Sequence, residues 1–377
     1  MRVCLIAEKP SLCPIVLPFI RAMHPDLDED AYACAYVHPY THLNPDFILP
    51  RGLRWKEYPF TGEPAYRDIT LSNVGRDGRR YYRVGFVPRL EDSHATGVPR
   101  TMTRFATPDP VFEDPQAEAC RRMRGAHVIY AAVDTHDSSW HALDRMLSLL
   151  ALDPAVEVRI PYLRSYAESD LGALFRRPHA PGDHHYREQV RRSRVARRFD
   201  YGYRANALAV MGRTMALAGA APGAEVPSKY GLQTLYMLRE AGPCSEQRAV
   251  DAMRRWRGTG KYAGMLREGY EIRGMGSPAS RSSILEDLKV AGILELDGRQ
   301  LRLSRLGDRF LDMVHPDCED PDLPFRIEGW KLIPDEAEAN ARVDRYLRTF
   351  WGKQIRRLGR ANSSGGVREL PGMVALS

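Results

Sequence analysis

The hydrophobic pattern of the first half of the chain predicts an α/β arrangement. Val3 to Ala7 form a short, continuously apolar run, and a second such run covers Val128 to Val133. Runs of this length are typical of buried strands in a parallel sheet. After the second run, large apolar residues recur at helical spacing as far as Leu150, which predicts a strand followed by a helix.

A carboxylate follows each of these two predicted strands. Glu8 follows the first strand, and Asp134 follows the second. In open parallel sheets, sites form outside the carboxyl ends of the strands, so we expect the two acids to lie near one another. The alternative is that each acid only caps the helix that follows it.

The second half of the chain has the patterns of several helices and one hairpin. Helical patterns cover residues 184–215, 229–256 and 281–288, and Asp297-Gly298 stands between two short alternating runs. An Asp-Gly pair in that position is a strong hairpin signal. The order helix, helix, hairpin is that of a winged helix, a common nucleic-acid-binding module. The alternative is a winged helix that serves only as a scaffold.

These patterns predict an α/β domain followed by a mainly α domain that contains the winged helix. The predicted segments are the α/β domain at 1–155, a first helical part at 156–218, a small-residue linker at 219–228, a second helical part with the winged helix at 229–350, and a flexible tail at 351–377.

Composition narrows the class of protein further. The chain has 377 residues, of which 44% are hydrophobic and 27% charged, as expected for two or three globular domains. No apolar run reaches the roughly 18 residues of a membrane span, and no signal-type leader opens the chain. We therefore expect no membrane association and a cytoplasmic location. The six cysteines form no C-x-x-C pair, which argues against a zinc ribbon or a disulfide scaffold.

The charge of the chain comes mainly from arginine. The net charge is +7, and 48 of the 55 basic residues are Arg. Residues 184–215 hold eight Arg against Glu188 and Asp200, and four of the eight (187, 191, 194 and 198) share one helical face. A stripe of one sign predicts a phosphate-binding surface, and the alternative is a solvated face. The predicted DNA-contacting residues are Arg194, Arg197, Arg198, Arg213 and Arg281.

Seven landmarks along the chain together resemble the type IA DNA topoisomerases. In chain order they are Glu-Lys-Pro-Ser at 8–11, Tyr-Thr-His-Leu at 40–43 with Trp55 and Pro59, Asp-Thr-His-Asp at 134–137, Arg197 with Phe-Asp-Tyr-Gly at 199–202, Met-Gly-Arg-Thr-Met at 211–215, Gly-Met-Gly-Ser-Pro-Ala-Ser-Arg at 274–281, and Asp-Pro-Asp-Leu at 320–323 with Glu328. The resemblance implies a Toprim (Rossmann-like) fold for the α/β domain and a DNA-holding role for the winged-helix domain.

The chain departs from this family at the gate. In the family, the gate domains lie between the segments that match 211–215 and 274–281 here, and they carry the nucleophilic Tyr in a Tyr-x-Arg-Thr-Asp context. The interval from Thr214 to Gly274 is too short for these domains, and Tyr230, Tyr262 and Tyr270 lack that context. The sequence therefore predicts that the gate and its nucleophile are missing.

The metal motif departs from the family as well. Closely spaced acids hold Mg²⁺ in the family, whereas His136 and Ser138 stand at two of those positions here. Imidazole is a poor Mg²⁺ ligand, and a shift of one residue brings in Asp137 instead. The resemblance then implies Glu8, Asp134 and Asp137 as Mg²⁺ ligands, with Glu8 and Lys9 as candidate catalytic residues.

Three functions fit these features. In the first, the chain holds single-stranded or distorted DNA without cutting it, as a reduced topoisomerase relative on a mobile element. In the second, it is a metal-dependent Toprim nuclease with Glu8 as general base. In the third, it is half of a split topoisomerase whose gate comes from a second chain. We favour the first hypothesis because it needs only residues that are present.

Overall fold

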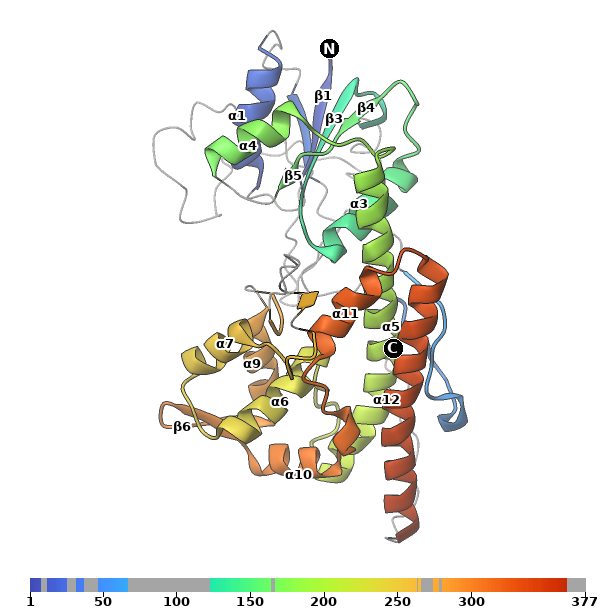
Figure 1. Cartoon of the computed structure of the whole chain (residues 1–377), viewed down its shortest axis with the longest axis vertical. Helices are drawn as coiled ribbons and strands as arrows, with labels where there is room; N and C mark the ends of the chain where they lie inside the picture. Colours follow the sequence, from blue (N-terminus) through green and yellow to red (C-terminus); the bar gives the residue numbers. More distant parts are fainter. Residues whose placement is uncertain are drawn as a thin grey trace. The chain divides into compact units, whose positions relative to one another are not determined.

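The computed structural model describes most of the chain, in two compact units. The described residues are 1–7, 12–25, 32–36, 47–66, 123–163, 167–262, 264–265, 274–277 and 280–364. The first unit contains residues 1–48 and 65–197, and the second contains residues 49–64 and 198–377. Figure 1 shows the elements of both units.

The first unit is built on a parallel sheet. Its strands are β1 (Val3–Ala7), β2 (Tyr32–Tyr36), β3 (Val128–Asp134), β4 (Glu157–Arg159) and β5 (Tyr162–Leu163). They lie in the order β2-β1-β3-β4, and β5 also pairs with β3. In the register of β1 and β3, Ala7 is opposite Ala132. The prediction of an α/β domain with a parallel sheet is confirmed.

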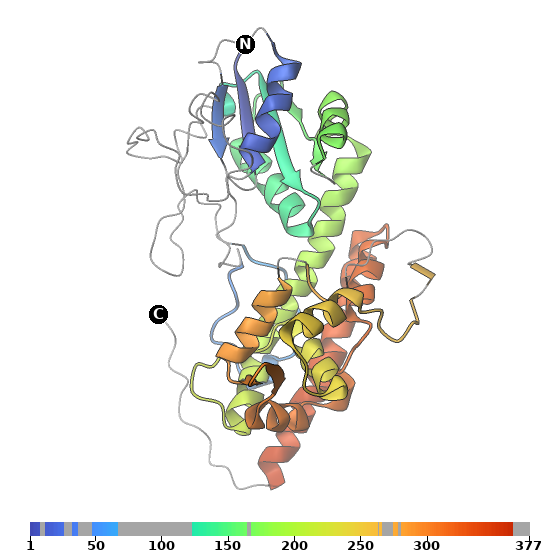
Figure 2. The same ribbon diagram turned by 90° about the vertical axis from the view of Figure 1, so that its left-hand side faces the viewer.

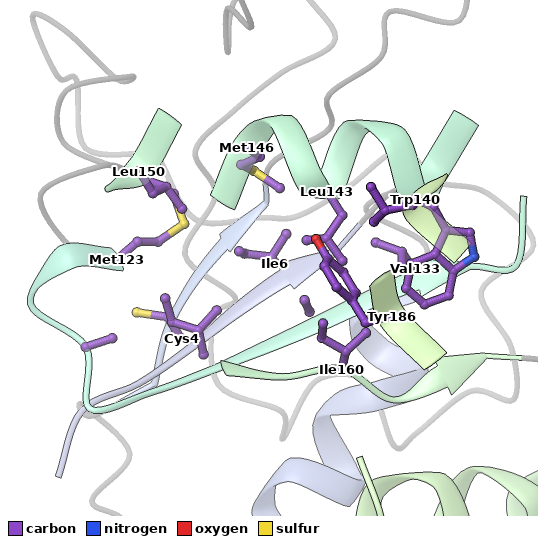
Figure 3. Packing of buried hydrophobic residues seen from close by; sticks show 14 residues of the cluster. Cys4, Ile6, Met123, Val133, Trp140, Leu143, Met146, Leu150, Ile160 and Tyr186 are labelled. Atoms are coloured by element: carbon purple, nitrogen blue, oxygen red, sulfur yellow. The ribbon is translucent and has the colours of Figure 1, made fainter. Parts of the chain in front are cut away.

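Helices cover both faces of this sheet, as the continuously apolar strands require. On one face, Ile6 and Val133 pack with Trp140 and Leu143 of α3 (Asp137–Leu150) (Figure 3). On the other face, the sheet packs against α1 (Cys13–Met23) and α4 (Glu168–Arg176) (Figure 2). Alternate side chains along one strand therefore enter two different cores.

The first unit extends past the boundary predicted at residue 155. The ring of Phe175 in α4 stacks on Phe19 of α1 and on Tyr130 of β3, so α4 belongs to the core of the sheet. The helix α5 (His184–Ala218) begins in the first unit, where Tyr186 is buried against α3, and continues into the second from Arg198 onward.

The second unit is mostly helical. Its other elements are η3 (Trp55–Glu57), α6 (Lys229–Ala241), α7 (Glu246–Arg255), α9 (Arg281–Val290), β6 (Leu294–Asp297), β7 (Gln300–Leu303), α10 (Arg305–Met313), η5 (Pro316–Cys318), α11 (Leu323–Lys331) and α12 (Glu336–Ser364). Serine side chains cap α6, α7 and α10 at Ser228, Ser245 and Ser304. The predicted hairpin at Asp297-Gly298 is confirmed, because β6 and β7 pair on either side of it.

The flexible tail predicted from residue 351 is wrong as far as Ser364. The last helix, α12, continues through Gly352 to Ser364, and the side chains of Trp351 and Leu358 are buried. Gln354 is also buried and donates to Thr214 Oγ1 at 3.0 Å. These contacts keep the helix intact past Gly352. From local sequence alone, a glycine at this position favours the end of a helix.

Candidate nucleic-acid interface

The register of the sheet determines where the predicted metal site would lie. The strands β1 and β3 are parallel neighbours, so they end at the same edge of the sheet. Asp137 lies in the first turn of α3, where a carboxylate is favoured by the helix dipole. Glu8 and Lys9 lie outside the described residues, and Asp134 is described only as the last residue of β3.

Magnesium binding at this edge stays a prediction. Among the residues that the structure describes, no group of three His, Cys, Asp or Glu side chains is placed to hold a metal ion. The described residues alone therefore do not provide the oxygen ligands that Mg²⁺ requires, and we derive no chemical step through a metal.

Arg198 is buried in an ion pair within the protein. Arg198 is only 8% exposed. Its Nε and Nη2 donate to the two carboxylate oxygens of Asp344 at 3.0 and 2.8 Å. The hydrogen bond to Asp344 raises the pKa of the guanidinium, and a second ion pair with Glu63 raises it further. This bidentate pair ties α5 to α12, which argues against the predicted phosphate contact.

Arg281 is also committed to the protein's own backbone. It is 4% exposed, and it donates to the carbonyl oxygens of Met275 and Gly276 at 3.2 and 3.0 Å. Gly274 and Gly276 have φ angles of 74° and 72°, so the turn needs residues without a Cβ. Arg281 therefore shapes the turn before α9 and is not presented to a DNA strand.

The arginines in the first half of α5 are largely paired. Arg191 and Arg192 both donate to Glu188, and the hydrogen bond from Arg191 chiefly lowers the pKa of that carboxyl to about 2. Arg194 pairs with Asp144 of α3 at 2.9 Å. Arg197 is buried and lies 4.1 Å from the centre of the Phe47 ring. Of the four arginines in the predicted one-sign stripe, Arg191, Arg194 and Arg198 are thus paired with acids, and Arg187 is exposed.

Arg213, the remaining predicted DNA contact, is exposed. Its guanidinium lies 4.9 Å from the centre of the Trp55 ring, which is the arrangement of a cation–π contact. Trp55 is half-buried in the short helix η3 and lies 6.1 Å from the ring of Tyr58. The structure therefore places Arg213 beside aromatic rings on the second unit.

A second row of arginines, which the sequence reasoning above did not identify, lies along α12. Its members are exposed and are Arg342, Arg345, Arg348, Arg356 and Arg360. They are spaced by three, three, eight and four residues, so they share one side of a helix with 3.6 residues per turn. On the same side, Glu338 is paired with Arg342. This spacing of charges in the sequence was the signal that could have revealed the row.

The segment from Trp55 to Thr61 joins Arg213 to the arginines of α12. Asn206 of α5 exchanges two hydrogen bonds of 2.7 Å with the backbone of Phe60. Arg348 donates to Thr61 at 3.2 Å, and a Cβ on Gly352 would lie 3.9 Å from Pro59 and 3.5 Å from the guanidinium of Arg356. In Figure 1 this light-blue segment runs beside α12. We call the surface of Trp55, Arg213 and the five α12 arginines the basic face.

Comparison with known proteins gives no match, either to a family model or to a curated sequence. The resemblance to type IA topoisomerases therefore rests on the seven landmarks alone. Two of them, Trp55 and Arg213, lie on the basic face. No helix among the described residues is long and apolar enough to cross a membrane.

Proposed function

We propose that this chain binds single-stranded or distorted DNA on the basic face, as a reduced relative of the type IA topoisomerases that does not pass strands. The observation that carries the proposal is that one segment, Trp55 to Thr61, contacts both Arg213, through Trp55, and the arginine row of α12, through Thr61. Proteins that hold single strands combine cations that follow the backbone with aromatic rings on which bases stack.

The spacing of the arginines favours a phosphate backbone as the ligand. Arginines three or four residues apart on a helix lie about 5–6 Å from one another. The row runs over the 19 residues from Arg342 to Arg360, about 27 Å, with one wider interval of eight residues between Arg348 and Arg356. A row of one sign at this spacing suits a ligand with regularly repeated negative charges. The half-buried rings of Trp55 and Tyr58 add faces on which an unpaired base can stack.

The order α7, α9 and hairpin supports the winged helix that the resemblance implies. In that fold, the helix before the hairpin is the usual candidate for a DNA groove. Here its exposed residues include Glu286 and Asp287, and Lys289 is paired with Glu246 and Glu286. Acids on this side repel phosphates, so we assign the winged helix a scaffolding role and the DNA contact to the basic face.

The region where the family has its gate supports binding without strand passage. Ten residues, 219–228, connect α5 to α6, and the described part of the interval up to Gly274 forms mainly α6 and α7. Burial raises the pKa of Tyr230, which makes it a weaker nucleophile at neutral pH. In the split-topoisomerase alternative, the nucleophilic tyrosine would come from a second chain.

A metal-dependent nuclease is the second candidate, and the register of the sheet favours it. Glu8 directly follows Ala7, which pairs with Ala132 two residues before Asp134. We expect a supercoiled plasmid to stay intact with Mg²⁺ or Mn²⁺. Nicking that disappears in Glu8→Ala would replace the binding proposal with the nuclease.

The binding proposal is tested by reversing charges on the basic face. Arg345→Glu with Arg356→Glu is expected to abolish binding of a labelled single strand, because neither arginine forms an ion pair among the described residues. Arg305→Glu with Arg309→Glu on α10 changes the charge equally and is the matched control. Equal affinities of the two variants would contradict the proposal.

A further inference from the structure

The loop that follows α7 is held in place by a buried carboxylate. Asp322 is 4% exposed and accepts hydrogen bonds from the backbone N–H and the hydroxyl of Thr259 at 2.8 and 2.6 Å. Gly258 has a φ of 60°, and a Cβ there would lie 2.2 Å from the Asp322 carboxylate. The indole N–H of Trp256 donates to the carbonyl oxygen of Pro321 at 2.7 Å. Hydrogen bonds to Asp322 and Pro321 therefore hold the backbone of this loop in one conformation.

Cations extend outward from the same loop. They are all exposed and are Arg254, Arg255, Arg257 and Lys261, which we call the cationic loop. Arg254 pairs with Asp251 at 3.1 Å, and Arg257 donates to the carbonyl oxygen of Trp256 at 2.9 Å. Among the described residues, neither Arg255 nor Arg257 forms an ion pair.

A further guanidinium lies close to this group. The backbone N–H of Met275 donates to Met253 at 2.9 Å, which fastens the turn before α9 to the end of α7. Burial lowers the pKa of the Arg281 guanidinium, and the nearby charge of Arg254 lowers it further. Like charges repel one another, and a bound anion would offset this repulsion.

The helix dipole explains only part of this charge. Cations in the last turn of a helix are stabilised by its C-terminal end, and Arg254 and Arg255 lie in the last turn of α7. That effect falls off within one turn, whereas Arg257 and Lys261 lie beyond the end of the helix. The surplus of positive charge on an internally held loop therefore points to an external anion.

We propose that the cationic loop is a second phosphate-binding site, which takes part of the backbone of the same DNA ligand as the basic face. The identity of the ligand rests on the proposed function above. The nearby rings are already engaged, because Trp256 is bonded to Pro321 and Tyr262 stacks on Phe325. The loop therefore contacts phosphates and makes no stacking contact with the bases.

The test compares two double variants in a salt titration with a labelled single-stranded oligonucleotide. Arg255→Ala with Arg257→Ala removes two cations of the loop, and Arg305→Ala with Arg309→Ala is the matched control on α10. Each phosphate contact to a single strand contributes about 0.7 to the slope of log K against log salt. We expect the slope of the loop variant to fall by about 1.4 and its affinity at 0.1 M salt to fall roughly tenfold or more. The control keeps the wild-type values.

Lysine replacements separate charge from structure. Arg255→Lys with Arg257→Lys is expected to retain the wild-type slope, because it retains both charges; a loss as large as in the alanine variant would overturn the phosphate contact. A loop variant that matches the α10 control, while Arg345→Ala with Arg356→Ala binds weakly, overturns this inference and leaves the basic face standing. Failure of the wild-type chain to bind any oligonucleotide overturns both proposals.

Discussion

The arginines of the first half of α5 and those of α12 are placed in opposite ways. On α5, Arg191 and Arg192 share Glu188, and Arg194 pairs with Asp144. On α12, the five arginines of the basic face are exposed, and Glu338 pairs with the first of them. The α5 arginines meet partners on their own helix and on α3, while the α12 arginines face outward. The two sets therefore differ in exposure and in the number of acids that face them, and the binding proposal rests on this difference.

The largest effect expected from this comparison is on stability at Arg198. Arg198 is 8% exposed, and replacing it with alanine leaves the Asp344 carboxylate without its bidentate partner. Breaking such a pair costs about 3 kcal/mol of unfolding free energy. Urea denaturation measures the change, and Arg345→Ala is the control, with an expected change of about 0.5 kcal/mol or less. Similar losses of unfolding free energy in the two variants would contradict the view that Arg198 on α5 is a structural residue and Arg345 on α12 is not.

The next effect concerns the aromatic part of the basic face. Trp55→Ala is expected to weaken single-strand binding by about 1–3 kcal/mol, because a stacked base contributes that much. Duplex binding is expected to change less, since paired bases present no free face. Fluorescence anisotropy with matched single-stranded and duplex oligonucleotides measures both values. An equal loss on both ligands would mean that Trp55 only supports Arg213.

A smaller effect is expected at Glu188. Its pKa is lowered to about 2 in the folded chain, chiefly by the hydrogen bond from Arg191, so its contribution to stability is complete above about pH 4.5. The contribution is lost as the pH falls from about 4.5 to 2. Glu188→Gln is therefore expected to lower stability by about 0.5–1 kcal/mol at pH 7 and to have no effect near pH 2. Denaturation curves at both pH values test this; a constant difference would show that the ion pairs are not its cause.

Much of the secondary structure could be predicted from local patterns. The strands β1 and β3, the helix at 281–288 and the Asp297-Gly298 hairpin each have a strong local signal. The inclusion of residues 49–64 in the second unit has no such signal, because Phe60 is held by Asn206, 146 residues away. The length of α12 likewise depends on burial of Trp351 by residues distant in sequence.

The candidate site was harder to predict than the fold. A positive stripe on α5 was visible in the sequence, but the carboxylates that neutralise it come partly from Asp144 and Asp344 on other helices. The exposed row on α12 follows a simple helical spacing, yet only burial of the opposite side shows which way it faces. A run of charged residues in the sequence therefore forms a charged surface only where distant segments do not supply ion-pair partners.

The most direct test of the central claim is the salt dependence of single-strand binding in three proteins. These are the wild type, Arg345→Ala with Arg356→Ala on α12, and Arg192→Ala with Arg194→Ala on α5. We predict that the slope of log K against log salt falls by about 1.4 in the α12 variant and stays at the wild-type value in the α5 variant. A fall in the α5 variant with no change in the α12 variant would contradict the assignment of DNA binding to the basic face.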